Sequence, residues 1–133
     1  MQTSLTNTSI SPAMLWGSRI LSGLPVLLLL FSAVMKLAKP APVVQEFTRF
    51  GFRESSILII GVLELACTLL YLIPRTAVLG AILLTGYLGG AIVTHLRVSD
   101  PVTNYGALMF GVFLWGGLYL RDERVRALIP LRK

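Results

Sequence analysis

A single carboxylate stands in the middle of a long apolar segment of this sequence. Glu64 is the one charged residue between Ser55 and Pro74, a stretch that reads SSILIIGVLELACTLLYLIP. An ionisable group inside a membrane is expensive to bury and is a functional candidate by default. Its chemistry is proton transfer, and we expect the carboxyl to be protonated unless Lys36 or another cation reaches it. The alternative is a protonated carboxyl that only hydrogen-bonds neighbouring helices.

Other polar residues gather near Glu64 if the apolar segments are helices that run side by side. Lys36 and His95 both fall at helix ends that meet one surface, and Glu64 lies about nine residues, or ~13 Å, below that surface. The other members of this candidate site are Tyr87, Thr85, Arg97 and Asp100. We therefore predict a funnel with charge at its mouth and the Glu64 carboxyl at its floor.

Several members of this group also have a simpler structural explanation. Lys36 and Arg97 are typical interface anchors, because long basic side chains extend from a helix end toward water. His95 fits a helix-end residue bonded to a neighbour, although an imidazole can also exchange protons at physiological pH. Asp100, which precedes Pro101, fits a turn or a helix cap.

The composition indicates lipid rather than water as the main solvent. Of the 133 residues, 55% are hydrophobic and 14% are charged, whereas a soluble domain carries about 25% charged residues. The net charge is +6, but the basic residues lie scattered at segment ends, which argues against a nucleic-acid partner. With one histidine and one cysteine, we predict no metal site and no intrachain disulfide, and no motif indicates a bound cofactor.

Four apolar segments account for most of the chain, at about 14–37, 55–73, 75–96 and 103–120. Each is close to the ~20 residues that cross a bilayer as a helix. We therefore predict an all-α fold, an integral membrane four-helix bundle of up-and-down topology that forms one domain over residues 1–133. The first segment has one alternative, a cleaved signal peptide.

Shorter features lie outside these segments. We predict that residues 1–12 form a disordered tail and that residues 121–133 form a basic amphipathic tail. In the longest link, Val43, Phe47 and Phe50 recur at helical spacing. Their spacing predicts a short helix that lies on the membrane surface.

The basic residues predict the orientation. An even number of spans places both termini on one side of the membrane. That side would hold seven basic residues, which are Arg19, Arg75, Arg121, Arg124, Arg126, Arg132 and Lys133. The other side would hold five, which are Lys36, Lys39, Arg49, Arg53 and Arg97. Because arginine and lysine favour the cytoplasm, we predict that both termini are cytoplasmic.

Small residues predict where the helices approach one another. The second segment carries a stripe of small and polar residues at helical spacing, made of Gly61, Glu64, Cys67, Thr68 and Tyr71. We therefore expect Glu64 to face protein rather than lipid. The third segment carries a Gly86-x-x-x-Gly90 pattern, which is typical of close helix packing in membranes.

Three short stretches also carry a family resemblance. FSAVMKL closes the first segment, GVLELACTLLYLIPR crosses the second and GGAIVTHLRVSDP closes the third. Together they resemble the DoxX-like family of small four-span bacterial membrane proteins, over about Pro25 to Arg126. The resemblance implies a four-helix bundle in the bacterial inner (plasma) membrane, with Lys36, Glu64 and His95 as its polar positions. The wider family includes a subunit of a thiosulfate-oxidising, quinone-reducing complex, which implies a redox association by analogy.

Three function classes remain open, and the catalytic residues are unassigned. The first is a redox-associated subunit that binds a quinone or similar lipid-soluble molecule, with His95 and Glu64 handling protons. The second is a small proton-coupled transporter, similar to the small multidrug resistance proteins. The third is a non-catalytic accessory or assembly protein. In each case we expect the lipid bilayer as a partner, together with a redox subunit or a second copy of the chain.

Overall fold

A computed structural model describes residues 10–129 of the chain, with residues 101–104 described by their backbone alone. The tail predicted at residues 1–12 lies mostly outside this range, as do the last residues of the tail predicted at 121–133. The described part of the chain is helical and contains no strand, which confirms the all-α class. The helices are α1 Pro12–Ala38, α2 Ala41–Arg49, α3 Glu54–Leu72, α4 Ala77–Arg97, α5 Pro101–Arg121 and α6 Glu123–Leu128.

Among the described residues, three helices are long and apolar enough to cross a membrane. These are α1, α3 and α4. Large apolar side chains remain exposed on their outer faces, including Leu27 and Phe31 of α1 and Ile59 of α3. Exposed apolar surface of this extent is typical of a face that contacts lipid.

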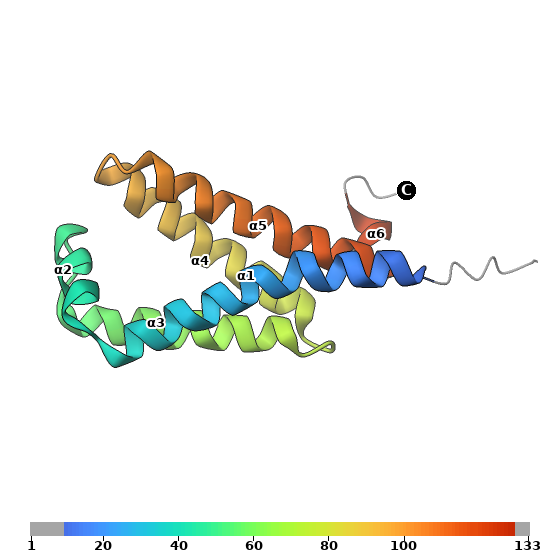
Figure 1. Cartoon of the computed structure of the whole chain (residues 1–133), viewed down its shortest axis with the longest axis horizontal. Coiled ribbons are helices and arrows are strands. Elements are labelled where there is room, and N and C mark those ends of the chain that lie inside the picture. The colour runs from blue at the N-terminus through green and yellow to red at the C-terminus, as the bar shows by residue number, and fades with distance from the viewer. Residues whose placement is uncertain (1–9, 130–133) are drawn as a thin grey trace, which may run out of the picture.

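The four longest helices pack side by side. α1 contacts α3 and α5, and α4 contacts the same two helices. In Figure 1, α1 and α4 run in one direction while α3 and α5 run in the other, and the start of α1 lies at the same end as α6. The buried core between them includes Leu29 of α1, Leu84 of α4 and Leu114 of α5.

Local sequence explains where α1 begins and ends. Ser11 is the N-cap residue, and its Oγ accepts a hydrogen bond from the Met14 backbone N–H at 3.2 Å. Pro12 occupies the first turn, where its missing N–H removes no helical hydrogen bond. The helix ends at Ala38, and the C-cap residue Lys39 adopts a left-handed backbone with φ of 49°. The chain then turns into the short amphipathic helix α2.

Glycines set the closest helix contacts, at positions other than the predicted Gly86-x-x-x-Gly90 pattern. Within the described part of the chain, a Cβ added at Gly86 or Gly90 would meet no other atom within 4 Å, so this pattern does not pack against a neighbouring helix there. At Gly80, in contrast, an added Cβ would clash with the Tyr71 backbone, and at Gly117 it would clash with Ser22. The α3–α4 and α1–α5 contacts therefore depend on these two glycines.

Candidate functional site

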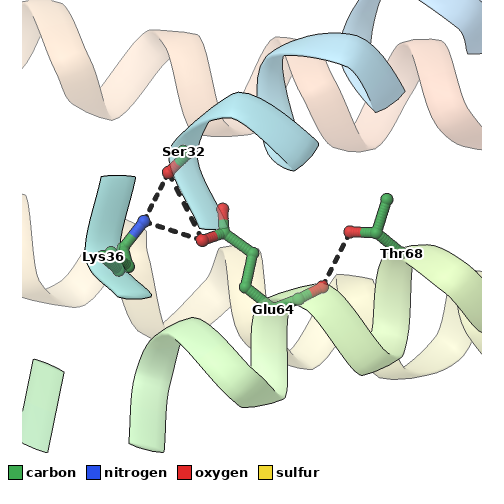
Figure 2. Close-up of polar contacts among 4 residues, drawn as sticks. All are labelled: Ser32, Lys36, Glu64 and Thr68. Carbon is green, nitrogen blue, oxygen red and sulfur yellow. Dashed lines mark hydrogen bonds and ion pairs between the residues drawn. The ribbon is translucent and has the colours of Figure 1, made fainter. Parts of the chain in front are cut away.

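The Glu64 carboxyl lies in the contact between α3 and α1. The residue is buried and 1% exposed. Lys36 Nζ lies 2.7 Å from Glu64 Oε2, and Ser32 Oγ donates a hydrogen bond to the same oxygen at 3.3 Å. Lys36 also donates to Ser32, so the three side chains form the closed triangle that Figure 2 shows. Lys36 is thus the cation that reaches the Glu64 carboxyl.

Helix geometry explains why these side chains meet. Ser32 and Lys36 lie one turn apart on α1 and therefore point to the same side. Gly61 lies nearly one turn before Glu64 on α3, and an added Cβ there would stand 2.9 Å from Lys36 Cβ and 3.5 Å from the Ala33 carbonyl oxygen. The missing side chain lets α1 approach α3 closely enough for Lys36 to reach the carboxyl.

The whole predicted stripe of α3 is buried, which confirms that Glu64 faces protein. The buried residues of this helix are Ile57, Gly61, Glu64, Cys67, Thr68 and Tyr71. Thr68 is fully buried, and its Oγ1 donates to the Glu64 backbone carbonyl at 2.7 Å rather than to the carboxyl (Figure 2). The carboxyl is therefore held from α1, while its own helix supplies the buried surroundings.

The pair formed by Lys36 and Glu64 is closely shielded from solvent. The Lys36 side chain is 12% exposed and the Glu64 side chain 2%. Removing two opposite charges from water is expensive, and their attraction offsets that cost only with good geometry and additional hydrogen bonds. The 2.7 Å contact and the Ser32 hydroxyl meet both requirements. Such a pair is weak evidence for a purely stabilising role, because well-packed apolar residues often serve stability equally well.

Tyr87 joins this group from a third helix. Its hydroxyl interacts with the Glu64 carboxyl, and its ring packs against the core. Thr85, two residues earlier on α4, is exposed and forms its hydrogen bonds with residues other than Glu64. It accepts a hydrogen bond from Trp115 Nε1 at 2.7 Å and donates to the Ala81 carbonyl at 2.7 Å. Tyr87 is thus the α4 residue of the predicted set that meets Glu64.

A second polar group, the end cluster, lies where α4 ends and contains Arg49, Phe50, His95 and Asp100. Asp100 Oδ2 is 3.7 Å from His95 Nδ1 and 3.4 Å from Arg49 Nη2. The Phe50 ring meets the imidazole edge to face, with ring centroids 5.0 Å apart. His95 Nδ1 is buried and has no hydrogen-bond partner in the described part of the chain, because 3.7 Å exceeds hydrogen-bond distance.

The segment after α2 closes over this end of α4. Gly51 has a positive φ of 84°, a conformation that favours glycine. A Cβ at this position would stand 2.9 Å from Arg97 Nη2, so the guanidinium lies directly against the turn. Arg97 therefore contacts the chain beyond α2, while His95 and Asp100 contact residues at the end of α2 itself.

The structure thus divides the predicted funnel residues into separate groups. Lys36, Glu64 and Tyr87 lie together; His95 and Asp100 lie in the end cluster. No hydrogen bond or ion pair joins the two groups among residues 10–129 as far as they are described. Within that range, no set of three or more histidine, cysteine or acidic side chains is arranged to hold a metal ion.

Sequence reasoning did not identify three residues that complete these groups. They are Ser32, Arg49 and Phe50. Ser32 precedes Lys36 by four residues, so the i, i+4 rule for helix neighbours could have found it. Arg49 and Phe50 carry no such local pattern, because their contacts depend on where the short helix α2 folds back.

Comparison with known proteins places the chain in a family. The family model described as the DoxX-like family matches residues 20–117. This range includes every residue of both polar groups. No curated protein and no solved structure matches the chain. The chain belongs to the DoxX-like family, and with its long apolar helices it is a multi-pass membrane protein.

Proposed function

We propose that this member of the DoxX-like family is a membrane subunit that handles protons for redox chemistry on a quinone or a similar lipid-soluble molecule. The observation that carries the proposal is the buried contact between Lys36 and Glu64, with Tyr87 beside it. An ionisable pair within membrane-spanning helices marks a proton or substrate path by default. Glu64 is the proton carrier in this proposal, and Lys36 stabilises negative charge that develops on a ligand.

The end cluster supports a proton entry point. His95 Nδ1 is buried without a hydrogen-bond partner among the described residues, and the Asp100 carboxylate stands 3.7 Å away. A small rotation of either side chain would close that gap to a hydrogen bond. An imidazole next to a carboxylate is a common arrangement for moving a proton near neutral pH. His95 would then exchange protons with the surface, and Glu64 would receive them deeper in the bundle.

The proposal includes the membrane arrangement that accompanies this site. We propose that α5 is a fourth span, so that α1, α3, α4 and α5 form an up-and-down membrane bundle. It would lie in the bacterial inner membrane, with both termini cytoplasmic. The single cysteine cannot form an intrachain dithiol, so electrons would come from a partner redox subunit or from a group bound at such a subunit.

A second candidate function is a non-catalytic accessory or assembly role. One specific observation favours it. Glu64 Oε2 already accepts from both Lys36 and Ser32, so the carboxyl has its hydrogen bonds without any ligand. In this alternative the pair only holds α1 against α3, and the protein acts through the surface that it presents to a partner.

Quinone binding to the purified protein separates the two candidates. Decyl-ubiquinone is titrated into protein in detergent, and quenching of the fluorescence of the two tryptophans reports binding. The variants are Glu64→Gln and His95→Ala. The matched control is Glu54→Gln, because this carboxylate starts the same helix and its side chain is 65% exposed.

The proposal expects weaker binding in Glu64→Gln and His95→Ala and unchanged binding in Glu54→Gln. Loss of a charge-assisted hydrogen bond is worth about 1.5–3 kcal/mol, which corresponds to roughly a tenfold or greater change in Kd. No binding by the unmodified protein, or equal affinity in all four proteins, rejects the quinone site and leaves the accessory role.

A further inference from the structure

A pocket lies at the opposite end of the bundle from the end cluster. It has a volume of about 510 Å³ and is lined by residues of α1, α3, α4 and α5 together with the connections at that end. This volume falls within the range of roughly 300–1,000 Å³ that is usual for small-ligand sites. Neither Glu64 nor His95 lines it, so its chemistry is separate from that of the proposed proton path.

Two arginines give this pocket its charge. Arg19 of α1 and Arg121 of α5 both line it. Within the described part of the chain, neither guanidinium has a carboxylate within ion-pair distance. Arg19 stacks on the Trp16 ring at 5.8 Å, and Arg121 lies over the Tyr71 ring at 5.0 Å. These contacts orient the two cations but leave most of their N–H donors available.

A serine hydroxyl and an aromatic hydroxyl hold Arg121 at the pocket wall. Arg121 Nη1 donates to Ser22 Oγ at 3.0 Å, and Ser22 Oγ shares a hydrogen bond with Tyr71 Oη at 2.8 Å. Tyr71 in turn donates to the Leu114 carbonyl at 2.6 Å. The chain of bonds ties three helices to the guanidinium, so its position is built into the fold rather than left to a free surface side chain.

The pocket wall also contains a carboxylate, Asp122. Its Oδ1 accepts a hydrogen bond from the Arg124 backbone N–H at 2.9 Å, because Asp122 is the N-cap residue of α6. The lining therefore carries two positive charges and one negative charge. The surplus positive charge favours an anion, and the planar guanidinium fork suits phosphate oxygens in particular.

Apart from Ser18, most of the remaining lining is apolar, and Val26 lies about two turns deeper in α1 than Arg19. Leu15, Val26, Leu72 and Ala77 belong to this part. Arg19 lies in the second turn of α1, and Arg121 is the last residue of α5, positions where basic side chains sit at the lipid headgroup level. The pocket thus offers cations at headgroup depth, with apolar side chains beside them and Val26 below them.

We propose that this pocket binds an anionic phospholipid, with its phosphate between Arg19 and Arg121 and an acyl chain along the apolar wall. Basic pockets between membrane helices are a recognised way to hold anionic headgroups. A bound lipid would connect α1, α3, α4 and α5 at this end, where Ser22 and Tyr71 already join three of them.

Native mass spectrometry of the full-length protein in detergent tests this proposal. The probes are phosphatidylglycerol, phosphatidylcholine with the same acyl chains, and inorganic phosphate. The variants are Arg19→Gln and Arg121→Gln. Arg75→Gln is the matched control, since Arg75 is an exposed arginine at the same end of the bundle and does not line the pocket.

We expect phosphatidylglycerol to bind better than the other two probes, and each of Arg19→Gln and Arg121→Gln to weaken its binding about fivefold or more. Arg75→Gln should bind it like the unmodified protein. If Arg121→Gln does not fold, Arg19→Gln decides, because Arg19 packs over the exposed Trp16 ring and makes no hydrogen bond or ion pair with another described residue.

Three results would overturn the proposal. Equal binding of phosphatidylcholine would mean that the guanidinium groups do not select the headgroup. Equal binding of inorganic phosphate would assign the site to a soluble anion. An equal loss in Arg75→Gln would reduce the effect to general surface charge.

Discussion

Replacing one residue of the Lys36–Glu64 pair is expected to destabilise the protein, because it leaves the other charged residue buried without its partner. In Lys36→Met, the Glu64 carboxyl stays in a site where its side chain is 2% exposed, without the cation that stood 2.7 Å away. In Glu64→Leu, the stranded lysine is 12% exposed and can extend toward the surface. The double variant leaves neither charge in the site, so its loss of unfolding free energy should be smaller than the sum of the two single losses.

Two known magnitudes bracket the size of this coupling. Breaking a buried ion pair from one side costs about 3–5 kcal/mol in soluble proteins. Polar contacts between membrane helices contribute ~0.6 kcal/mol on average and up to ~1.7 kcal/mol. Because this contact joins opposite charges and has Ser32 as an additional donor, we expect a coupling energy of about 1.5–3 kcal/mol. Lys36→Met should be the more damaging single change.

Equilibrium unfolding in mixed detergent micelles, followed by circular dichroism, measures the free energy of unfolding for the four proteins of this cycle. The control cycle uses Lys39 and Glu54, which lie 4.0 Å apart with side chains 36% and 65% exposed. Exposed pairs of this kind are screened by solvent and contribute little. A Lys36–Glu64 coupling no larger than that of the control cycle would refute the reasoning, as would Glu64→Leu being the more damaging change.

Three further predictions concern packing, a buried hydroxyl and orientation. Gly80→Ala places a Cβ against the Tyr71 backbone and should lower the free energy of unfolding by about 1–3 kcal/mol. Gly86→Ala should leave it unchanged, and thermal unfolding compares the two variants. Tyr71→Phe removes the hydrogen bonds of its hydroxyl to Ser22 at 2.8 Å and to the Leu114 carbonyl at 2.6 Å. The free energy of unfolding should fall by about 1–3 kcal/mol, and an unchanged unfolding midpoint would contradict this. A cytoplasm-only fluorescent reporter fused after Lys133 should fluoresce, and a dark fusion would reverse the proposed orientation.

Features that depend on nearest neighbours along the chain could be predicted from the sequence. The helical class and the long apolar helices follow from the length and composition of the segments, because a helix satisfies its backbone hydrogen bonds within itself. The buried stripe of α3 follows from the 3.6-residue period, which places Gly61, Glu64 and Thr68 on one face. The resemblance to the DoxX-like family rests on short stretches that the family model also covers.

The glycine pattern is a feature whose packing could not be predicted from neighbouring residues in the sequence. Gly86 and Gly90 stand four residues apart and present a face without side chains, yet that face meets no other helix among the residues that the structure describes. Gly80 and Gly117 form the tight contacts instead. A sequence pattern identifies a face that can pack closely, whereas the rotation of each helix about its axis decides which face does so.

The contacts within the two polar groups likewise depend on the rotation and register of whole helices. Lys36 and Glu64 are 28 residues apart in the chain, and they meet because Gly61 lets α1 settle against α3 in one register. His95 stands with Arg49 and Phe50 because α2 folds back over the end of α4. The helices, their apolar character and the buried face that carries Glu64 follow from the amino-acid sequence alone. Which polar side chains touch depends on the complete fold, because a contact of about 3 Å requires the register and rotation of two helices together, and packing along their whole length sets both.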